Sequence, residues 1–185
     1  MSTTPQPRAA SADFDAGSKR LPTAATLQSV ARIMCAQGKD EQCEVVLQRL
    51  VHDFPTYAPA YNELAELYLR QERGASAVRI LELGLEQAPN DAVLLNNLGL
   101  CRVMEKSYEQ ALLHFTAAAA CDPADVRCRC NMAMALGLLG RMDEALALYQ
   151  QSMPASDAHF NLGVLHRMRG EDPQAAEEFA LAKSQ

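Results

Sequence analysis

Apolar side chains recur at helical spacing twice within each stretch of 34 residues along most of this chain. Between residues 92 and 125, for example, Leu94 and Leu98 fall on one face of a helix. A break follows at residues 106–107, and a second apolar pattern then continues until Pro123 ends it. Each stretch therefore predicts two helices that pack antiparallel on each other.

A proline marks the same point in successive stretches. Pro55, Pro89 and Pro123 follow one another at intervals of 34 residues. A period of this length, with one helix pair in each unit, is typical of a helical solenoid. A single pair cannot bury its apolar face alone, and stacked pairs share one continuous core. The sequence thus predicts an all-α protein with a long exposed surface.

Small and large residues alternate in register with this period. A small residue where two helices cross lets their backbones approach, and a large residue beside it fills the remaining space. The alternation therefore predicts which helix faces are buried. The small positions are Ala65, Gly99, Ala133 and Gly163 in first helices and Cys43, Ala77, Ala111, Ala145 and Ala175 in second helices, and the large ones are Leu47, Leu81, Phe115, Tyr149 and Phe179.

Two segments resemble the tetratricopeptide repeat (TPR) family. They are Asn97-Leu98-Gly99 with Tyr108, Ala111, Phe115, Ala118 and Pro123, and Asn161-Leu162-Gly163 with Gly170, Ala175 and Phe179. The resemblance implies a TPR superhelix, an α-solenoid of about five helix-pair repeats. The expected repeats are 24–57, 58–91, 92–125, 126–155 and 156–185. Because only 30 residues separate Ala145 from Ala175, we expect the second helix of the fourth repeat to lack its last turn.

Residues 1–23 differ from the rest of the chain. They are mostly small, polar or charged, with only Phe14 and Leu21 bulky, which predicts a disordered leader. The leader lacks the apolar core of a secretory signal, and no later segment is long enough to span a membrane. The sequence therefore predicts a cytoplasmic protein without a membrane span. Its net charge of −6 argues against a nucleic-acid partner, which would require a basic stripe.

Six cysteines raise the question of metal or redox chemistry. Without an export signal disulfides are not expected, so we predict six reduced thiols. Cys121, Cys128 and Cys130 cluster between the third and fourth repeats. On a helix, however, the two thiols of Cys-x-Cys point about 200° apart, which suits one tetrahedral ion poorly. We therefore expect no metal and no other cofactor.

Motifs of the common enzyme classes are not found. The sequence has no phosphate-binding glycine loop and no nucleophile elbow. The pattern therefore favours a protein that is not an enzyme. A metal or redox enzyme built on the cysteine cluster is the remaining enzymatic alternative.

The TPR resemblance implies that the first helix of each repeat lines a concave groove. Here that stripe is polar in repeats one and two, with Gln28, Arg32 and Glu66, and apolar in repeats three to five. An apolar stripe that faces solvent usually marks a partner site. In the alternative interpretation, helix curvature or the leader folding back buries the stripe. The candidate groove residues are Asn62, Asn96, Leu100, Met104, Asn131, Met134, Leu138, Phe160, Val164 and Met168.

These patterns favour a non-catalytic protein–protein interaction module, an adaptor or assembly scaffold that binds a protein or peptide segment in its groove. The alternative is a chaperone or assembly factor of a bacterial secretion or pilus system. It rests on the similarity of the last three repeats to TPR proteins of tight-adherence pilus assembly. The final helix leaves Ala176, Ala180 and Leu181 without a following repeat, which predicts weak self-association through that end.

Overall fold

The computed structural model describes residues 21–184, so most of the expected leader at residues 1–23 lies outside the described residues. This part of the chain contains helices and no strands. The helices are α1 (Ala24–Ala36), α2 (Asp40–Asp53), α3 (Ala58–Arg70), α4 (Gly74–Gln87), α5 (Ala92–Met104), α6 (Tyr108–Cys121), α7 (Val126–Leu138), α8 (Met142–Gln150), α9 (Ala155–Met168) and α10 (Asp172–Ser184). The all-α prediction is confirmed.

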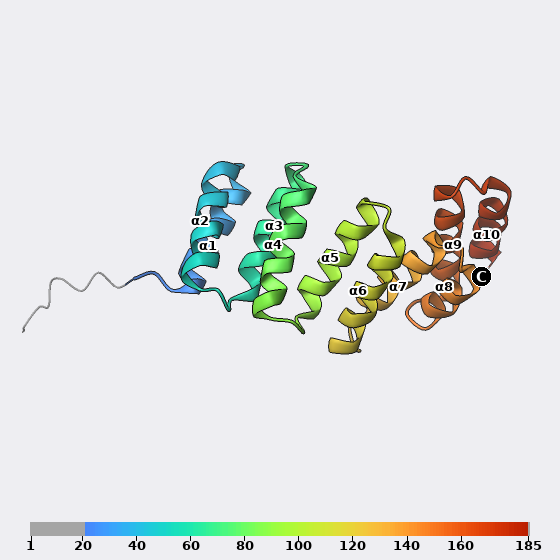
Figure 1. Cartoon of the computed structure of the whole chain (residues 1–185). Helices are drawn as coiled ribbons and strands as arrows, with labels where there is room; N and C mark the ends of the chain where they lie inside the picture. The colour runs from blue at the N-terminus through green and yellow to red at the C-terminus, as the bar shows by residue number, and fades with distance from the viewer. Residues whose placement is uncertain (1–20, 185) are drawn as a thin grey trace, which may run out of the picture.

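The helices follow one another in space in the order of the sequence (Figure 1). Each odd-numbered helix packs on the even-numbered helix that follows it, and each even-numbered helix packs on the first helix of the next pair. This sequential packing of antiparallel pairs is the superhelix that the 34-residue period predicts. The boundaries expected for the individual repeats stay a prediction.

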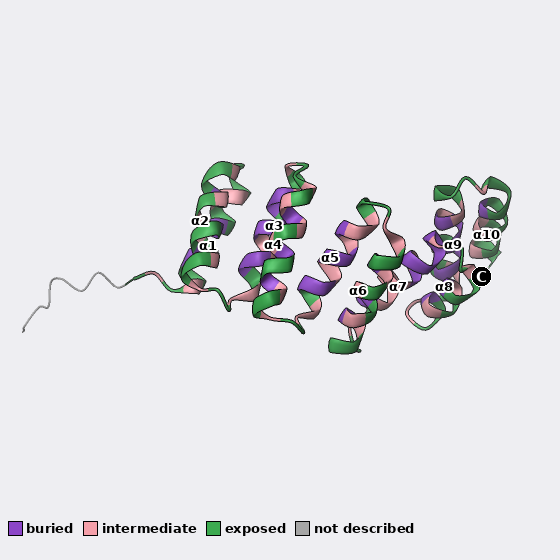
Figure 2. Cartoon of the chain, viewed as in Figure 1, coloured by how far each residue is buried: buried purple, intermediate pink, exposed green. Residues whose placement is uncertain are grey.

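The core lies between the helices and follows the predicted alternation of small and large residues (Figure 2). Ala111 and Phe115 are fully buried. A Cβ atom on Gly99 would lie 2.5 Å from the Phe115 ring, and one on Gly163 would lie 2.7 Å from the Phe179 ring. Only glycine fits at these two crossings, because real Cβ atoms do not approach so closely.

The turn inside each helix pair has a left-handed residue at one fixed position. Gly38, Gly140 and Gly170 have φ values of 71°, 83° and 78° there. Glu72 and Lys106 hold the same position in their own repeats with φ values of 59° and 60°. A side chain makes this conformation costly, so two of the turns carry backbone strain.

Helix α8 has 9 residues, whereas α2, α4 and α6 each have 14. The expected loss of the last turn in the fourth repeat is therefore confirmed. The chain leaves α8 through residues 151–154 and enters α9 directly.

The prediction of six reduced thiols is wrong. Cys35 at the end of α1 and Cys43 in the first turn of α2 form a disulfide, with their Cα atoms 5.4 Å apart. The tight turn between the two helices brings these residues together, although 8 positions separate them in the sequence. The free cysteines among the described residues are Cys101, Cys121, Cys128 and Cys130.

None of the helices within residues 21–184 combines the length and the apolar character needed to cross a membrane.

Candidate partner-binding surface

The first helices of the repeats form one continuous face of the array. Helix α3 contacts α5, α5 contacts α7, and α7 contacts α9. Among residues 21–184 the second helices make no comparable contacts with one another. The face lined by first helices is therefore the tighter, inner side of the superhelix, where the candidate groove residues were expected.

Three large apolar side chains of the candidate set are open to solvent. Met104 at the end of α5 is 67% exposed, and Phe160 and Met168 on α9 are 54% and 61% exposed. Large apolar residues are also exposed on second helices, for example Leu113 at 70%, so these three side chains matter because they lie on one face of the array.

The middle of the stripe is more deeply packed. Leu100 and Met134 are half-buried and pack around the same buried residues, Phe115 and Ala135. Val164 is also half-buried. Leu138 is only 6% exposed and belongs to the core cluster of α7 to α9. The structure thus places Leu138 among core residues, where a partner cannot reach most of its side chain.

The asparagines of the inner face bond to one another. Asn131 Nδ2 donates to Asn96 Oδ1 at 2.7 Å, and Asn96 Nδ2 donates to Asn97 Oδ1 at 3.4 Å. Asn97 Nδ2 in turn donates to Asn62 Oδ1. Asn62 Nδ2 then donates to Glu66 Oε1 at 2.8 Å. This amide ladder joins α7, α5 and α3, so these side chains already have partners within the chain.

The apolar end of the surface carries an aromatic pair. The rings of Phe160 and Phe179 are 5.5 Å apart between centroids, and the guanidinium of Arg167 lies 4.9 Å above the Phe179 ring. A depression of about 410 Å³ opens beside this pair, with Asp157 and Lys183 at its edge. The site offers aromatic surface with charges of both signs around it.

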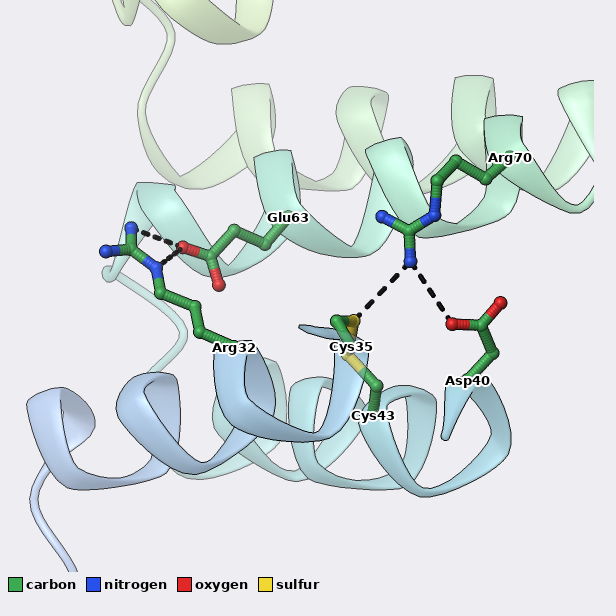
Figure 3. The surroundings of a disulfide bond; sticks show 6 residues. All are labelled: Arg32, Cys35, Asp40, Cys43, Glu63 and Arg70. Atoms are coloured by element: carbon green, nitrogen blue, oxygen red, sulfur yellow. Dashed lines mark hydrogen bonds and ion pairs between the residues drawn. A yellow bond between two sulfur atoms is a disulfide. The ribbon is translucent and has the colours of Figure 1, made fainter. Parts of the chain in front are cut away.

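A polar depression of about 320 Å³ lies at the other end of the inner face, between α1 and α3. Arg32 contacts Glu63 through Nε at 2.8 Å and through a terminal nitrogen at 2.6 Å. Arg70 lies beside Cys35 and Asp40 on the opposite side (Figure 3). The sequence pattern identified Arg32 and Glu66 only as polar stripe residues. In the sequence, the only indication of this depression is that the first helices of repeats one and two carry several charged side chains.

Hydrogen bonding and burial shift the pKa values of Arg32 and of three cysteine thiols. The hydrogen bond that Arg32 donates to Glu63 raises the pKa of the guanidinium above its usual value. Burial raises the pKa of the thiols of Cys101, Cys128 and Cys130, which keeps them protonated near neutral pH. Within the described residues, no group of three or more His, Cys, Asp and Glu side chains is arranged to hold a metal ion.

Comparison with known protein families identifies the family to which this helical array belongs. One tetratricopeptide repeat model matches residues 44–98, and a second matches residues 130–185. The two matches together cover more than half of the chain, which belongs to the tetratricopeptide repeat family. Proteins of this fold are generally protein–protein interaction modules. Among the curated proteins, none matches the chain.

Several solved structures share the fold. MamA residues 41-end from Desulfovibrio magneticus RS-1 is 18% identical with a TM-score of 0.70, covering 87% of this chain and 93% of its own. YrrB, described as a TPR protein with an unusual peptide-binding site, is 21% identical with a TM-score of 0.67, covering 86% and 84%. Pseudomonas aeruginosa pilF is 18% identical with a TM-score of 0.68, covering 87% and 75%. At these identities the likeness concerns the fold alone.

Proposed function

We propose that this protein is a non-catalytic adaptor or assembly scaffold that binds a segment of a partner protein along the inner face of repeats three to five. The observation that carries the proposal is the exposure of Met104, Phe160 and Met168 on first helices. Apolar anchors of this kind supply most of the affinity at protein interfaces. Methionine suits such a surface because its flexible side chain adapts to different partners.

The amide ladder distinguishes the asparagines from the apolar members of the candidate groove set. Asn62, Asn96 and Asn131 bond within the chain and brace neighbouring helices. A partner backbone would have to replace bonds that already exist, which gains little free energy. We therefore assign the affinity of the surface to its apolar side chains and the shape of the surface to the asparagines.

Selection from a displayed library of random peptides tests the proposal and does not require the natural partner to be identified first. The peptides selected on the wild-type protein are measured against Phe160→Glu and Met168→Glu. The matched control is Leu113→Glu, which places the same charge on α6, a second helix, at a side chain that is 70% exposed. We expect binding to fall at least about tenfold in the two groove variants, because a carboxylate is poorly tolerated in an apolar contact.

The same experiment has an outcome that rejects the proposal. Peptides that bind Phe160→Glu and Met168→Glu as tightly as the wild type would place the binding surface elsewhere. Circular dichroism of each variant checks that the helices remain folded, so that a loss of binding can be assigned to the surface and not to unfolding.

The alternative is a chaperone or assembly factor of a bacterial secretion or pilus system, which would hold an apolar client segment in the same groove. It is favoured by the Asn-Leu-Gly segments at 97–99 and 161–163 together with the short fourth repeat. The two functions differ in their clients. Protection of an isolated apolar pilus or secretion subunit from aggregation, lost in Met168→Glu, would favour the chaperone.

We also propose a cytoplasmic location, with which the disulfide is compatible only if the bond is transient. Disulfides are rare in cytosolic proteins, and those that occur are usually transient and respond to redox conditions. The Cys35–Cys43 bond would accordingly form and break during the life of a cytoplasmic protein. Thiol trapping in intact cells checks this: a bond that is always complete would place the protein in an oxidising compartment.

A further inference from the structure

The polar depression on the inner face of repeats one and two contains a sulfur atom beside a cation. A terminal nitrogen of Arg70 lies 3.6 Å from Cys35 Sγ and 3.3 Å from Asp40 Oδ1 (Figure 3). Cys35 is bonded to Cys43, so the guanidinium faces one end of a disulfide. This arrangement is distant from the apolar surface of repeats three to five, and the proposed function does not use it.

The two sulfur-bearing residues differ in access. Cys43 is fully buried at 0% exposure, within the core cluster of α1 to α5. Cys35 is only half-buried and lines the depression of about 320 Å³. A thiol group of a small molecule or of a protein can therefore reach Cys35 and not Cys43.

The charges around Cys35 favour a thiolate at that position. The carboxylates of the depression already have partners: Glu63 accepts from Arg32 and Gln28, and Glu66 accepts from Asn62. Asp40 on α2 shares the Arg70 guanidinium, which is the cation in contact with the sulfur. A neighbouring arginine is one of the features that lower the pKa of a cysteine thiol and raise its reactivity.

We propose that Cys35 is a thiol–disulfide exchange site, with Cys43 as its resolving cysteine and Arg70 as the positioning residue. A thiolate of a small thiol or a protein dithiol attacks Cys35 Sγ, which breaks the bond to Cys43 and releases the Cys43 thiolate to take a proton. A mixed disulfide then links Cys35 to the incoming sulfur.

A second exchange step resolves the mixed disulfide and leaves both cysteines of the protein reduced. Another thiolate attacks the incoming sulfur of the mixed disulfide, and Cys35 leaves as a thiolate beside the Arg70 guanidinium. In total the protein disulfide gains two electrons and two protons, and two reductant thiols become one disulfide. The reverse sequence, with a disulfide as oxidant, restores the bond between α1 and α2.

A variant that isolates Cys35 makes the proposal testable. Cys43→Ala leaves Cys35 without its disulfide partner, and alanine is already the residue at this repeat position at 77, 111, 145 and 175. The probe is the neutral disulfide of 2-mercaptoethanol, which carries no charge for Arg70 to attract. Peptide mass spectrometry of the folded protein gives the rate of modification at each cysteine, with exposed Cys121 as the internal reference.

We expect Cys35 to react about threefold faster than Cys121 in Cys43→Ala. Adding Arg70→Gln should lower the Cys35 rate about threefold, because a nearby cation shifts a thiol pKa by roughly one unit and a thiolate becomes less nucleophilic as its pKa falls. Adding Arg70→Lys should restore most of the rate, and Cys121 should react alike in all variants. Rescue by lysine distinguishes the effect of charge from a structural role of Arg70.

Two results would overturn the proposal. One is a Cys35 rate no higher than that of Cys121, and the other is a Cys35 rate that Arg70→Gln leaves unchanged. In the wild-type protein, 2-mercaptoethanol should form its mixed disulfide at Cys35. A mixed disulfide found at Cys43 instead would contradict the assignment of the two roles. Peptide binding by the apolar surface is measured separately, so failure of either proposal leaves the other intact.

Discussion

A carboxylate introduced at position 138 and one introduced at position 168 should affect folding very differently. Leu138 is 6% exposed and Met168 is 61% exposed, although both lie on the inner stripe. Leu138→Glu should lower the free energy of unfolding by at least about 3 kcal/mol, because it buries an unpaired charge. Met168→Glu should change it by less than about 0.5 kcal/mol, as expected for an exposed site.

Urea unfolding followed by circular dichroism measures both effects. Leu138→Met is the control for position 138, since a swap of similar volume should cost less than about 1.5 kcal/mol. Equal stability of Leu138→Glu and the wild type would mean that position 138 is open to solvent and belongs to the binding surface after all.

Lys106 offers a stabilising substitution. It occupies the left-handed turn position at φ 60°, where Gly38, Gly140 and Gly170 stand in other repeats. Lys106→Gly should raise the free energy of unfolding by about 0.5–1 kcal/mol, because glycine adopts this conformation without steric cost. Lys106→Ala should give no such gain. Thermal and urea unfolding of the two variants would show whether strain is present, and equal stabilities would contradict it.

The repeat period predicts the burial of some residues. The burial of others depends on neighbours in the folded structure that are distant in the sequence. The burial of Ala111 and Phe115 follows from the 34-residue period, because every repeat uses those positions alike. The burial of Leu138 depends on how the next repeat packs, because Leu138 belongs to the same core cluster as Leu162 and Leu165 of α9. No period within the sequence contains that information.

At the scale of the element, the disulfide joins α1 covalently to the helix on which it packs. Helix α1 packs mainly on α2, whereas inner helices have neighbours on both sides. The bond between Cys35 and Cys43 closes a loop with a sequence separation of 8. Closing a loop of that length contributes about 2–3 kcal/mol through the entropy of the unfolded chain.

Removing the bond by Cys43→Ala should therefore weaken α1 and α2 first. Hydrogen exchange should show faster opening of amides in residues 24–53, while those of α5 to α10 keep their protection, since each repeat contacts only its neighbours. Cys121→Ser, at an exposed free thiol, is the control and should leave all rates unchanged. A uniform loss of protection along the whole chain would mean that the array unfolds as one unit.

Element lengths were largely predictable, and the disulfide was not. The spacing of Ala145 and Ala175 identified α8 as a shortened helix, and its 9 residues agree. The expectation of reduced thiols rests on the cellular compartment, which carries no information about the distance between two cysteines. A turn of three residues between α1 and α2 places Cys35 and Cys43 within bonding distance once the two helices are antiparallel.

The architecture of the whole molecule follows from the 34-residue period, whereas its candidate binding surface depends on positions that differ between repeats. A repeated helix pair determines the solenoid, because each unit packs on the next in the same way. The sequence predicts the properties of the candidate site only in part. Met104, Phe160 and Met168 are exposed as the stripe required, while Asn62, Asn96 and Asn131 are occupied by bonds between repeats. Those bonds depend on the curvature of the array, which the pattern within one repeat does not determine.

Self-association is the expectation at the scale of the whole molecule. Helix α10 packs mainly on α9, and its other side leaves Leu181 44% exposed next to the exposed residues Ala176 and Ala180. A second copy that packs on this face would cover these apolar side chains. Small apolar contacts of this size give weak complexes, so we expect dissociation constants on the order of 0.1–1 mM.

Sedimentation equilibrium over a range of protein concentrations measures this association. Leu181→Lys should abolish it, because the contact would then cover a charged ammonium group. Leu113→Lys on α6, where the side chain is 70% exposed, should leave the association unchanged. The comparison separates a specific contact through α10 from general stickiness of apolar residues. If both variants reduce the association equally, general hydrophobicity and not the α10 face causes it. A wild-type protein that stays monomeric at millimolar concentration would show that the α10 face does not bind a second copy.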